Sequence, residues 1–483
     1  MRRLIPLALL VAAPALAQSG SALQAGRAQP ITAEERRQGD QVNSALVEQY
    51  GGALSGRQAA YAEAVGRRIA TQSGLASSPG AFNVALLNSP VDNAFAIPGG
   101  YVYVTRNLMA LMNDEAELAA VMGHEVAHVA ARHSRSRQAR AQRNSVFGAL
   151  AQLGLGALFG DSGLAGLAGR SAPTLFQLDT LGFSRGQETQ SDDLAVSYLA
   201  RAGYDPLALS TMLDSLARQT ALQGRLAGEA RTLPPWASTH PDPASRVRRA
   251  REQAARAGGA GGVRNREAFL QAIDGMMYGE DPAQGVVEGN RFLHPQIGIA
   301  FDIPQGFTVA NGARAVTISG PGAQAQFSGG PFRGDLDAYL AEVVRGLGAS
   351  AAARPERTSV NGMPAAYTRL RASSGGTPVD VTVFAYQLSP NQAYHFTTVA
   401  AAGRGAGGLE RTFGSFRRLS REERAAIRPR FVRVVTVRPG DTPASLSARM
   451  AYSNLRLERF LALNRLDPRT ALRPGDKVKL VTY

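Results

Sequence analysis

Hydrophobic residues return every three or four positions through most of residues 32–251, which is the spacing of helices with one buried face. Thr32-Ala33-Glu34-Glu35 is typical of a capping box and predicts a helix that ends near Gly51-Gly52. A second helix is expected over residues 58–72. A longer one begins at Asn113, with apolar residues at Leu118, Val121, Met122, Val126 and Val129.

Strand patterns are few in this first region and dominate later. Residues 82–87 and 101–104 predict two short strands on either side of Pro98-Gly99-Gly100. After the alanine- and glycine-rich stretch 254–262, strands are expected at 297–303, 316–318, 378–386 and 394–399, with one helix over 335–344. The fold class is therefore a mainly α domain with a small edge sheet, followed by an α+β domain with a mainly antiparallel sheet.

The C-terminal residues predict a third, small domain. Residues 435–442 and 472–480 read as strands at its two ends, and two short helices lie between them. This βααβ pattern resembles a LysM module. The resemblance implies a shallow groove that binds the N-acetylglucosamine backbone of peptidoglycan.

Composition limits the chemistry that is open to the chain. The 483 residues are enough for about two to four domains. There is no cysteine, which excludes thiol nucleophiles, disulfides and cysteine-ligated metal sites. The net charge is +15, so anionic surfaces are plausible partners.

The first residues predict export. Arg2 and Arg3 precede the apolar run 4–13, and Ala15-Leu16-Ala17 is typical of a signal-peptide cleavage site. Export removes nucleic acid as the natural target of the positive charge and leaves lipid headgroups, lipopolysaccharide or cell-wall carboxylates.

These patterns divide the chain into six expected segments. They are a signal peptide (1–17), a first, mainly α domain (18–255), a linker with a short helix (256–289), the α+β accessory domain (290–417), a second linker (418–430) and the LysM-like domain (431–483).

The helix that begins at Asn113 contains His124-Glu125-Val126-Ala127-His128. Residues four apart share one face of a helix, so both imidazole rings can bind a single cation. Glu125 is offset by one position, near enough to contact a water at the metal without being a ligand. A carboxylate there can accept a proton from the water and pass it to a leaving amine, the chemistry of a zinc hydrolase.

Two histidines and a water leave zinc one protein ligand short. His133 is five residues past His128 and turned away from the ligand face, so we interpret it as a helix-end or packing residue. Glu188 is the better candidate, because apolar residues at helical spacing follow it and indicate a second helix. Asp192 shares the face of Glu188 and can hold a ligand histidine from behind.

At this point the chain resembles the gluzincin zinc metallopeptidases that include CAAX prenyl proteases, HtpX-like proteases and periplasmic outer-membrane quality-control proteases. The resemblance covers about residues 32–251. It rests on Asn-Ala-Phe-Ala-Ile-Pro-Gly-Gly (93–100), Asp-Glu-Ala-Glu-Leu (114–118) leading into the histidine pair, Ser-Arg (184–185) through Glu188 to Asp192, and Thr-His-Pro (239–241) with Arg246. Ser191 departs from it, since the family usually has alanine there.

The resemblance implies that His124, His128 and Glu188 bind one zinc ion per chain and that Glu125 is the general base. His240 and Arg246 would approach the metal from the opposite side and stabilise the oxyanion. In some relatives the histidine equivalent to His240 can occupy the metal as a latch.

The resemblance also implies that an edge strand pairs with an extended substrate peptide, through Gly99, Gly100, Tyr101 and Val102. The nearly uncharged stretch 146–169 has two interpretations, a buried hairpin over the active site or a segment that contacts the membrane surface.

Other features are interpreted as structural. Residues 182–186 match a serine-hydrolase elbow and residues 403–408 a dinucleotide fingerprint, but neither has the parallel α/β context that those motifs need. His294 and His395 are isolated and are expected to be packing residues.

The sequence thus predicts an exported, periplasmic zinc endopeptidase at the outer membrane or cell wall. Its expected partners are unfolded or misassembled envelope polypeptides, peptidoglycan, and a membrane surface through residues 146–169. Two alternatives stay open: a peptidoglycan hydrolase targeted by the LysM-like module, and a latched zinc protein that acts as a chaperone or scaffold.

Overall fold

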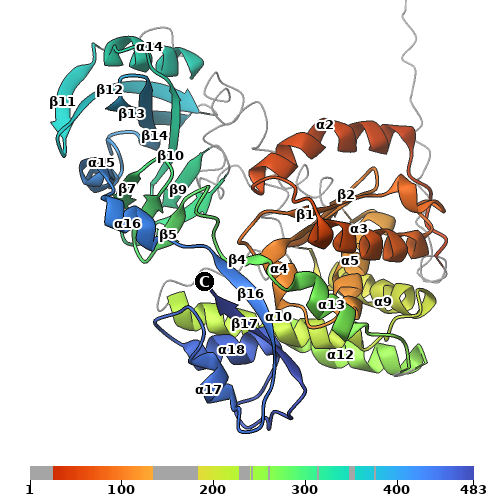
Figure 1. Cartoon of the computed structure of the whole chain (residues 1–483). Helices are drawn as coiled ribbons and strands as arrows, with labels where there is room; N and C mark the ends of the chain where they lie inside the picture. The colour runs from red at the N-terminus through yellow and green to blue at the C-terminus, as the bar shows by residue number, and fades with distance from the viewer. Residues whose placement is uncertain are drawn as a thin grey trace, which may run out of the picture.

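The computed structural model describes residues 26–133, 183–227, 240, 243–258, 261–312, 315–347, 354–374 and 377–483. Helices gather around a small sheet in the first part of the chain, and larger sheets form a second body beside them (Figure 1). The expected signal peptide and the segment 146–169 lie outside the described residues.

The first body is mainly helical. Its helices are α2 (Ala33–Gln49), α3 (Arg57–Ala70), α4 (Arg106–Leu111), α5 (Glu115–Ala130), α9 (Arg185–Arg201), α10 (Ala208–Ala227), α12 (Pro243–Arg256) and α13 (Arg266–Ile273). Thr32 and Glu35 form the expected capping box at the start of α2. Every residue of α5 is buried, because α3, α9, α10 and the sheet surround it.

The small sheet contains β1 (Asn83–Leu87), β2 (Ala94–Ile97) and β3 (Tyr101–Thr105), in the order β1-β3-β2. The expectation that Tyr101 and Val102 lie in an edge strand is wrong, because β3 pairs with β1 in parallel and with β2 antiparallel. Gly99 and Gly100 take positive φ angles of 100° and 87° in a tight turn, which folds β3 back along β2. Among the described residues, β2 is the edge strand on the side of α5.

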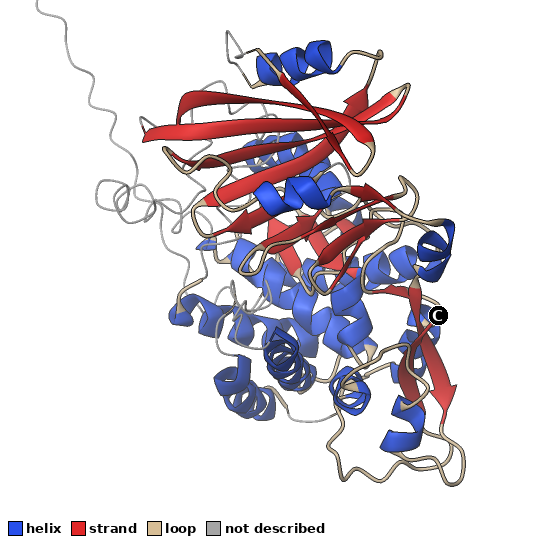
Figure 2. Cartoon of the chain, turned by 90° about the vertical axis from the view of Figure 1, so that its left-hand side faces the viewer, coloured by secondary structure: helices blue, strands red, loops and turns tan. Residues whose placement is uncertain are grey.

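Antiparallel sheets form most of the second body, shown as red ribbons in Figure 2. Within the described residues, a seven-stranded sheet has the order β11-β12-β13-β14-β10-β9-β8 and a four-stranded sheet has the order β15-β7-β6-β5. The strands are β5 (Val286–Glu288), β6 (Arg291–His294), β7 (Ile299–Asp302), β8 (Thr308–Asn311), β9 (Val316–Gly320), β10 (Ala323–Pro331), β11 (Glu356–Val360), β12 (Met363–Ser374), β13 (Thr377–Ser389), β14 (Gln392–Ala401) and β15 (Arg417–Arg418). Helix α14 (Leu336–Gly346) packs on β12 and β13, and α15 (Glu410–Ser415) packs on β7 and β11.

The C-terminal part contains β16 (Arg430–Thr436), α17 (Pro443–Ser447), α18 (Arg456–Asn464) and β17 (Lys477–Thr482). It is docked on the helical body. The buried ammonium group of Lys479 donates hydrogen bonds to the carbonyl oxygens of Ala110, Leu111 and Met112, at 2.8, 3.1 and 2.5 Å. These carbonyls end α4, so a lysine of the C-terminal part caps a helix of the first body.

The expected linker 256–289, which contains its expected short helix, is largely packed, whereas in 418–430 the buried residue is Leu419. In 256–289, α13 buries Phe269, Leu270 and Ile273 in the helical core, and β4 (Met277–Tyr278) pairs with β16. In 418–430, Leu419 is buried beside β5 and β6, and a short helix, α16 (Arg421–Ala426), follows. Their apolar residues lie at helical or strand spacing inside stretches whose charge and glycine content suggested loops.

No helix in the described part of the chain has both the length and the apolar character that crossing a bilayer requires.

Candidate metal centre

Helices α5 and α9 pack against each other and bring the three expected ligands together. The Nε2 atoms of His124 and His128 lie 3.0 Å apart. The Glu188 carboxylate lies 3.6 Å from Nε2 of His124 and 3.5 Å from Nε2 of His128. All three side chains are buried.

These separations fit a tetrahedral zinc site. Ligand atoms about 2.0–2.1 Å from zinc lie about 3.3 Å from one another at tetrahedral angles. Because Nδ1 of His124 faces Asp192, a neutral His124 ring offers the lone pair of its Nε2 to the cluster, where a cation shared with His128 can bind both nitrogens. The donor atoms of His124, His128, Glu188 and His240 all lie within 4.8 Å of one another.

The charge around the ligands also calls for a cation. Glu125, Glu188 and Asp192 are buried, and the buried Arg246 pairs with Glu188 and Asp192. Although burial opposes it, Asp192 and Glu188 raise the pKa of His124 to about 9, so the carboxylates leave an excess of negative charge that favours a further proton or a cation. A divalent cation balances that excess.

Asp192 holds His124 from behind, as expected. Its Oδ1 lies 3.0 Å from Nδ1 of His124, which leaves Nε2 to face the cluster. Arg246 in turn binds Asp192 with two hydrogen bonds, of 2.8 and 2.6 Å, and its Nη1 lies 2.6 Å from Glu188 Oε2. The guanidinium thus orients two carboxylates in this structure. Its expected contact with an oxyanion stays a prediction.

His240 closes the fourth side of the cluster. Its Nδ1 lies 3.0 Å from Glu188 Oε1 and 3.4 Å from Nε2 of His124. Zinc in hydrolases keeps one position open for water or substrate, whereas closed four-ligand sites are structural. In this structure a donor atom of His240 lies near enough to the other three to be a fourth ligand.

Glu125 lies beside the cluster and outside it. Its side chain is buried, and its Oε1 has no hydrogen-bond partner among the described residues. Nε2 of His240 lies 3.5 Å from that oxygen. An orphaned carboxylate oxygen at this place fits a base whose partner is a water or a reacting group.

The local environment separates the two glutamates. Burial raises the pKa of Glu125. Burial would also raise the pKa of Glu188, but the facing His240 and His124 hold it well below its usual value. Glu188 therefore remains an anionic ligand, while Glu125 accepts a proton more readily.

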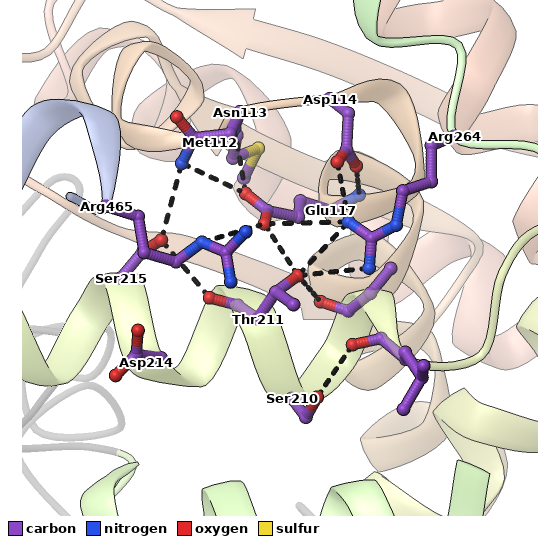
Figure 3. A network of polar contacts seen from close by, with 12 residues as sticks. Met112, Asn113, Asp114, Glu117, Ser210, Thr211, Asp214, Ser215, Arg264 and Arg465 are labelled. Atoms are coloured by element: carbon purple, nitrogen blue, oxygen red, sulfur yellow. Dashed lines mark hydrogen bonds and ion pairs between the residues drawn. The ribbon is translucent and has the colours of Figure 1, made fainter. Parts of the chain in front are cut away.

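A polar network fixes the start of α5 (Figure 3). Asp114 Oδ1 accepts a hydrogen bond from the backbone N–H of Glu117 at 3.0 Å, and Asp114 Oδ2 accepts one from Arg264 at 2.6 Å. Glu117 also accepts a hydrogen bond from the hydroxyl of Thr211 on α10 at 2.6 Å. Arg465, at the end of α18, lies 4.0 Å from the same carboxylate. The helix that carries both histidines is thus anchored to α10 and to the C-terminal part.

The sequence reasoning missed the contacts of His133. Helix α5 ends at Ala130, and Arg132 has a positive φ of 54°, so the chain turns back and places the His133 ring against His128. Its Nδ1 lies 2.9 Å from Nδ1 of His128, so the ring packs directly against a candidate ligand. Helical spacing could not show this contact, because the helix has already ended.

Two family models match the chain. Residues 56–254 match the model of peptidase family M48, and residues 435–481 match the LysM domain. The first match runs from α3 to α12 and includes every residue of the cluster. Residues 56–254 are therefore similar to peptidase family M48. The resemblance to zinc metallopeptidases and the resemblance to a LysM module are both confirmed.

Curated relatives of this M48 domain carry protease names. The β-barrel assembly-enhancing protease of Escherichia coli K12 is 32% identical over 197 residues, which are 40% of this chain and 38% of the relative. The mitochondrial metalloendopeptidase OMA1 of Schizosaccharomyces pombe is 33% identical over 195 residues, 40% of this chain and 52% of the relative. Metalloprotease LoiP of E. coli K12 is 34% identical over 134 residues, 26% of this chain and 48% of the relative. The matches thus span about half or less of each relative.

Proposed function

We propose that this chain is a zinc-dependent endopeptidase that hydrolyses peptide bonds of envelope proteins. The observation that carries the proposal is the buried convergence of His124, His128 and Glu188, with Glu125 unpaired beside them. The match of residues 56–254 to family M48 supports the same reaction class.

His124, His128 and Glu188 would hold the zinc ion. When bound, zinc acts as a Lewis acid that polarises a peptide carbonyl and makes a water molecule acidic. Glu125 Oε1 is placed to accept a proton from that water and to return it to the leaving amine. Asp192 and Arg246 keep the ligands in orientation throughout, because their hydrogen bonds do not involve the reacting atoms.

His240 must move before a substrate can enter. Once displaced, its imidazole would lie beside the scissile carbonyl and could donate a hydrogen bond to the developing oxyanion. Arg246 holds Glu188 and Asp192 in orientation, and its contact with the oxyanion belongs to the same proposal. Substrate access would then depend on the position of His240.

The edge strand for substrate is β2. Among the described residues, 94–97 pair with β3 alone, and they pack on α5, which carries His124 and His128. An extended peptide can add to such an edge through main-chain hydrogen bonds. Gly99 and Gly100 would shape the turn that ends this edge, whereas Tyr101 and Val102 lie in the central strand.

Export, location and partners belong to the same proposal. The signal-peptide pattern of residues 1–17 and the protease names of the relatives support a periplasmic enzyme that acts on unfolded or misassembled envelope polypeptides. The LysM domain supports attachment to peptidoglycan at the cell wall or outer membrane. A contact with the membrane surface through residues 146–169 remains part of the proposal.

The test compares two substrates and one variant. We expect the purified, zinc-loaded chain to cleave casein, a chelator to abolish the cleavage, and Glu125→Gln to lack it while still binding zinc. Digestion of purified peptidoglycan without cleavage of casein would replace the proposal with the peptidoglycan hydrolase.

A latched zinc protein that acts as a chaperone or scaffold is the second candidate, favoured by the closed position of His240. Complementation of a deletion strain separates the two. A scaffold keeps its function in Glu125→Gln, whereas a protease loses it.

A further inference from the structure

His133 lies between a metal ligand and helix α9. Its ring is buried, its Nδ1 lies 2.9 Å from Nδ1 of His128, and its Nε2 lies 3.0 Å from Oε1 of Gln190. Gln190 is on α9, midway between the ligand Glu188 and Asp192. The three side chains form one hydrogen-bonded line from the cluster to α9.

The direction of each hydrogen bond in this line follows from the ligand. Nε2 of His128 faces His124 and Glu188, so in the metal-binding form it offers a lone pair and the ring proton lies on Nδ1. That Nδ1–H can donate only if Nδ1 of His133 is unprotonated. His133 then carries its proton on Nε2 and donates it to a carbonyl oxygen, which Gln190 supplies.

We propose that His133, oriented by Gln190, is a positioning residue that holds His128 in the metal-binding tautomer. This inference rests on the proposed zinc site. Helix α9 would thereby orient both ligand histidines, His124 directly through Asp192 and His128 indirectly through Gln190 and His133. The opposite tautomer of His133 would donate to His128, place the proton on its Nε2 and block the metal.

The backbone supports a dedicated role for His133. Arg132 adopts a left-handed conformation, with φ of 54°, which costs free energy for a residue other than glycine. That turn is what carries the His133 ring back to His128 after the helix ends. Ser191 Oγ is the competing contact of Nδ1 of His133, but at 3.5 Å it is too long for a good hydrogen bond.

Zinc affinity tests the proposal without reference to catalysis. We would measure it by chelator competition for the full chain and for His133→Phe, Gln190→Leu and the double variant. Loss of a hydrogen-bond partner behind a ligand histidine lowers metal affinity about 10- to 100-fold. We expect His133→Phe to fall in this range and Gln190→Leu to show a smaller loss, with no further loss in the double variant because both act through one line.

Two variants serve as controls. Gln190→Glu keeps an acceptor for the Nε2–H of His133 and should retain zinc affinity within a few fold of the wild type. Ser191→Ala should retain it as well, since its contact is too long. Unchanged affinity in His133→Phe, or independent losses that add in the double variant, would overturn the proposal. The melting temperature of each zinc-free variant checks that its fold is intact.

The tautomer provides a direct readout. The chain has six histidines, so a long-range ¹H–¹⁵N spectrum of the zinc-loaded protein can be assigned by comparison with His133→Phe. We expect His133 to be protonated on Nε2 alone, and protonation on Nδ1 would contradict the proposal. Wild-type protein that binds no zinc would refute the proposed function itself, whereas tight wild-type binding with an unaffected His133 variant would refute only this inference.

Discussion

Two regions of this chain bury histidines, and they satisfy them differently. In the seven-stranded sheet, Nδ1 of His395 lies 2.9 Å from the hydroxyl of Tyr339, and Nε2 lies 3.3 Å from the hydroxyl of Ser328. Burial lowers the pKa of His395 to about 4, so the ring is neutral and needs no counter-ion at pH 7. This arrangement is complete without a ligand.

The cluster between α5 and α9 is not complete in that sense. Nε2 of His124 faces Nε2 of His128, and the carboxylates of Glu188 and Asp192 share the guanidinium of Arg246. Burial of a histidine therefore says little about its function. A functional site differs from a packing site because the surrounding residues leave some of its lone pairs and charges without partners.

The largest effect is expected for the unpaired base. Glu125→Gln keeps the shape of the side chain and the three ligands but cannot accept a proton, so hydrolysis should fall about 10²- to 10⁴-fold. Zinc content should remain that of the wild type. Initial rates on casein and metal analysis of the same sample measure both, and a variant that keeps its rate would remove Glu125 from the mechanism.

The next effect contrasts a buried arginine with an exposed one. In chelated protein, Arg246→Met leaves Glu188 and Asp192 without their cation and should lower the free energy of unfolding by about 3–5 kcal/mol. Arg357 pairs with Asp335 and Asp337 on the surface of the sheet domain, and Arg357→Met should leave stability unchanged. Urea denaturation of both variants measures the two changes in the free energy of unfolding. Equal losses in the free energy of unfolding would show that Glu188 and Asp192 need their cation no more than the surface carboxylates Asp335 and Asp337 do.

How far the sequence predicts the site depends on whether the relation is local. The pairing of His124 and His128 follows from helical geometry, since residues four apart share a face. Glu188 comes from a second helix that packs on the first, which an apolar pattern and a family resemblance could indicate. The contact of His133 with His128 depends on a left-handed turn at Arg132, which the hydrophobic periodicity of the sequence cannot predict.

The same distinction applies to the fold. The capping box of Thr32 and Glu35 is local, and the structure has it as expected. The order β1-β3-β2 is a set of non-local pairings, and the strand patterns indicated β1 and β3 but missed β2, the edge strand beside α5. The expected linker 256–289 is largely packed because α13 and β4 bury apolar residues against distant elements, which composition cannot show.

The smallest effect is expected in the sheet domain. His395→Phe loses two hydrogen bonds with neutral hydroxyls and should cost about 1–2 kcal/mol of stability. Zinc content and hydrolysis should not change. Thermal unfolding and the casein assay test this prediction, and a loss of zinc or of activity would mean that the two regions are coupled.

The central claim is that His124, His128 and Glu188 bind a single metal ion. Metal analysis of the purified full chain beside Glu188→Ala tests it most directly. The account predicts one zinc ion per wild-type chain and little or none in the folded variant. Equal zinc in both proteins, or no zinc in the wild type after loading, would contradict it.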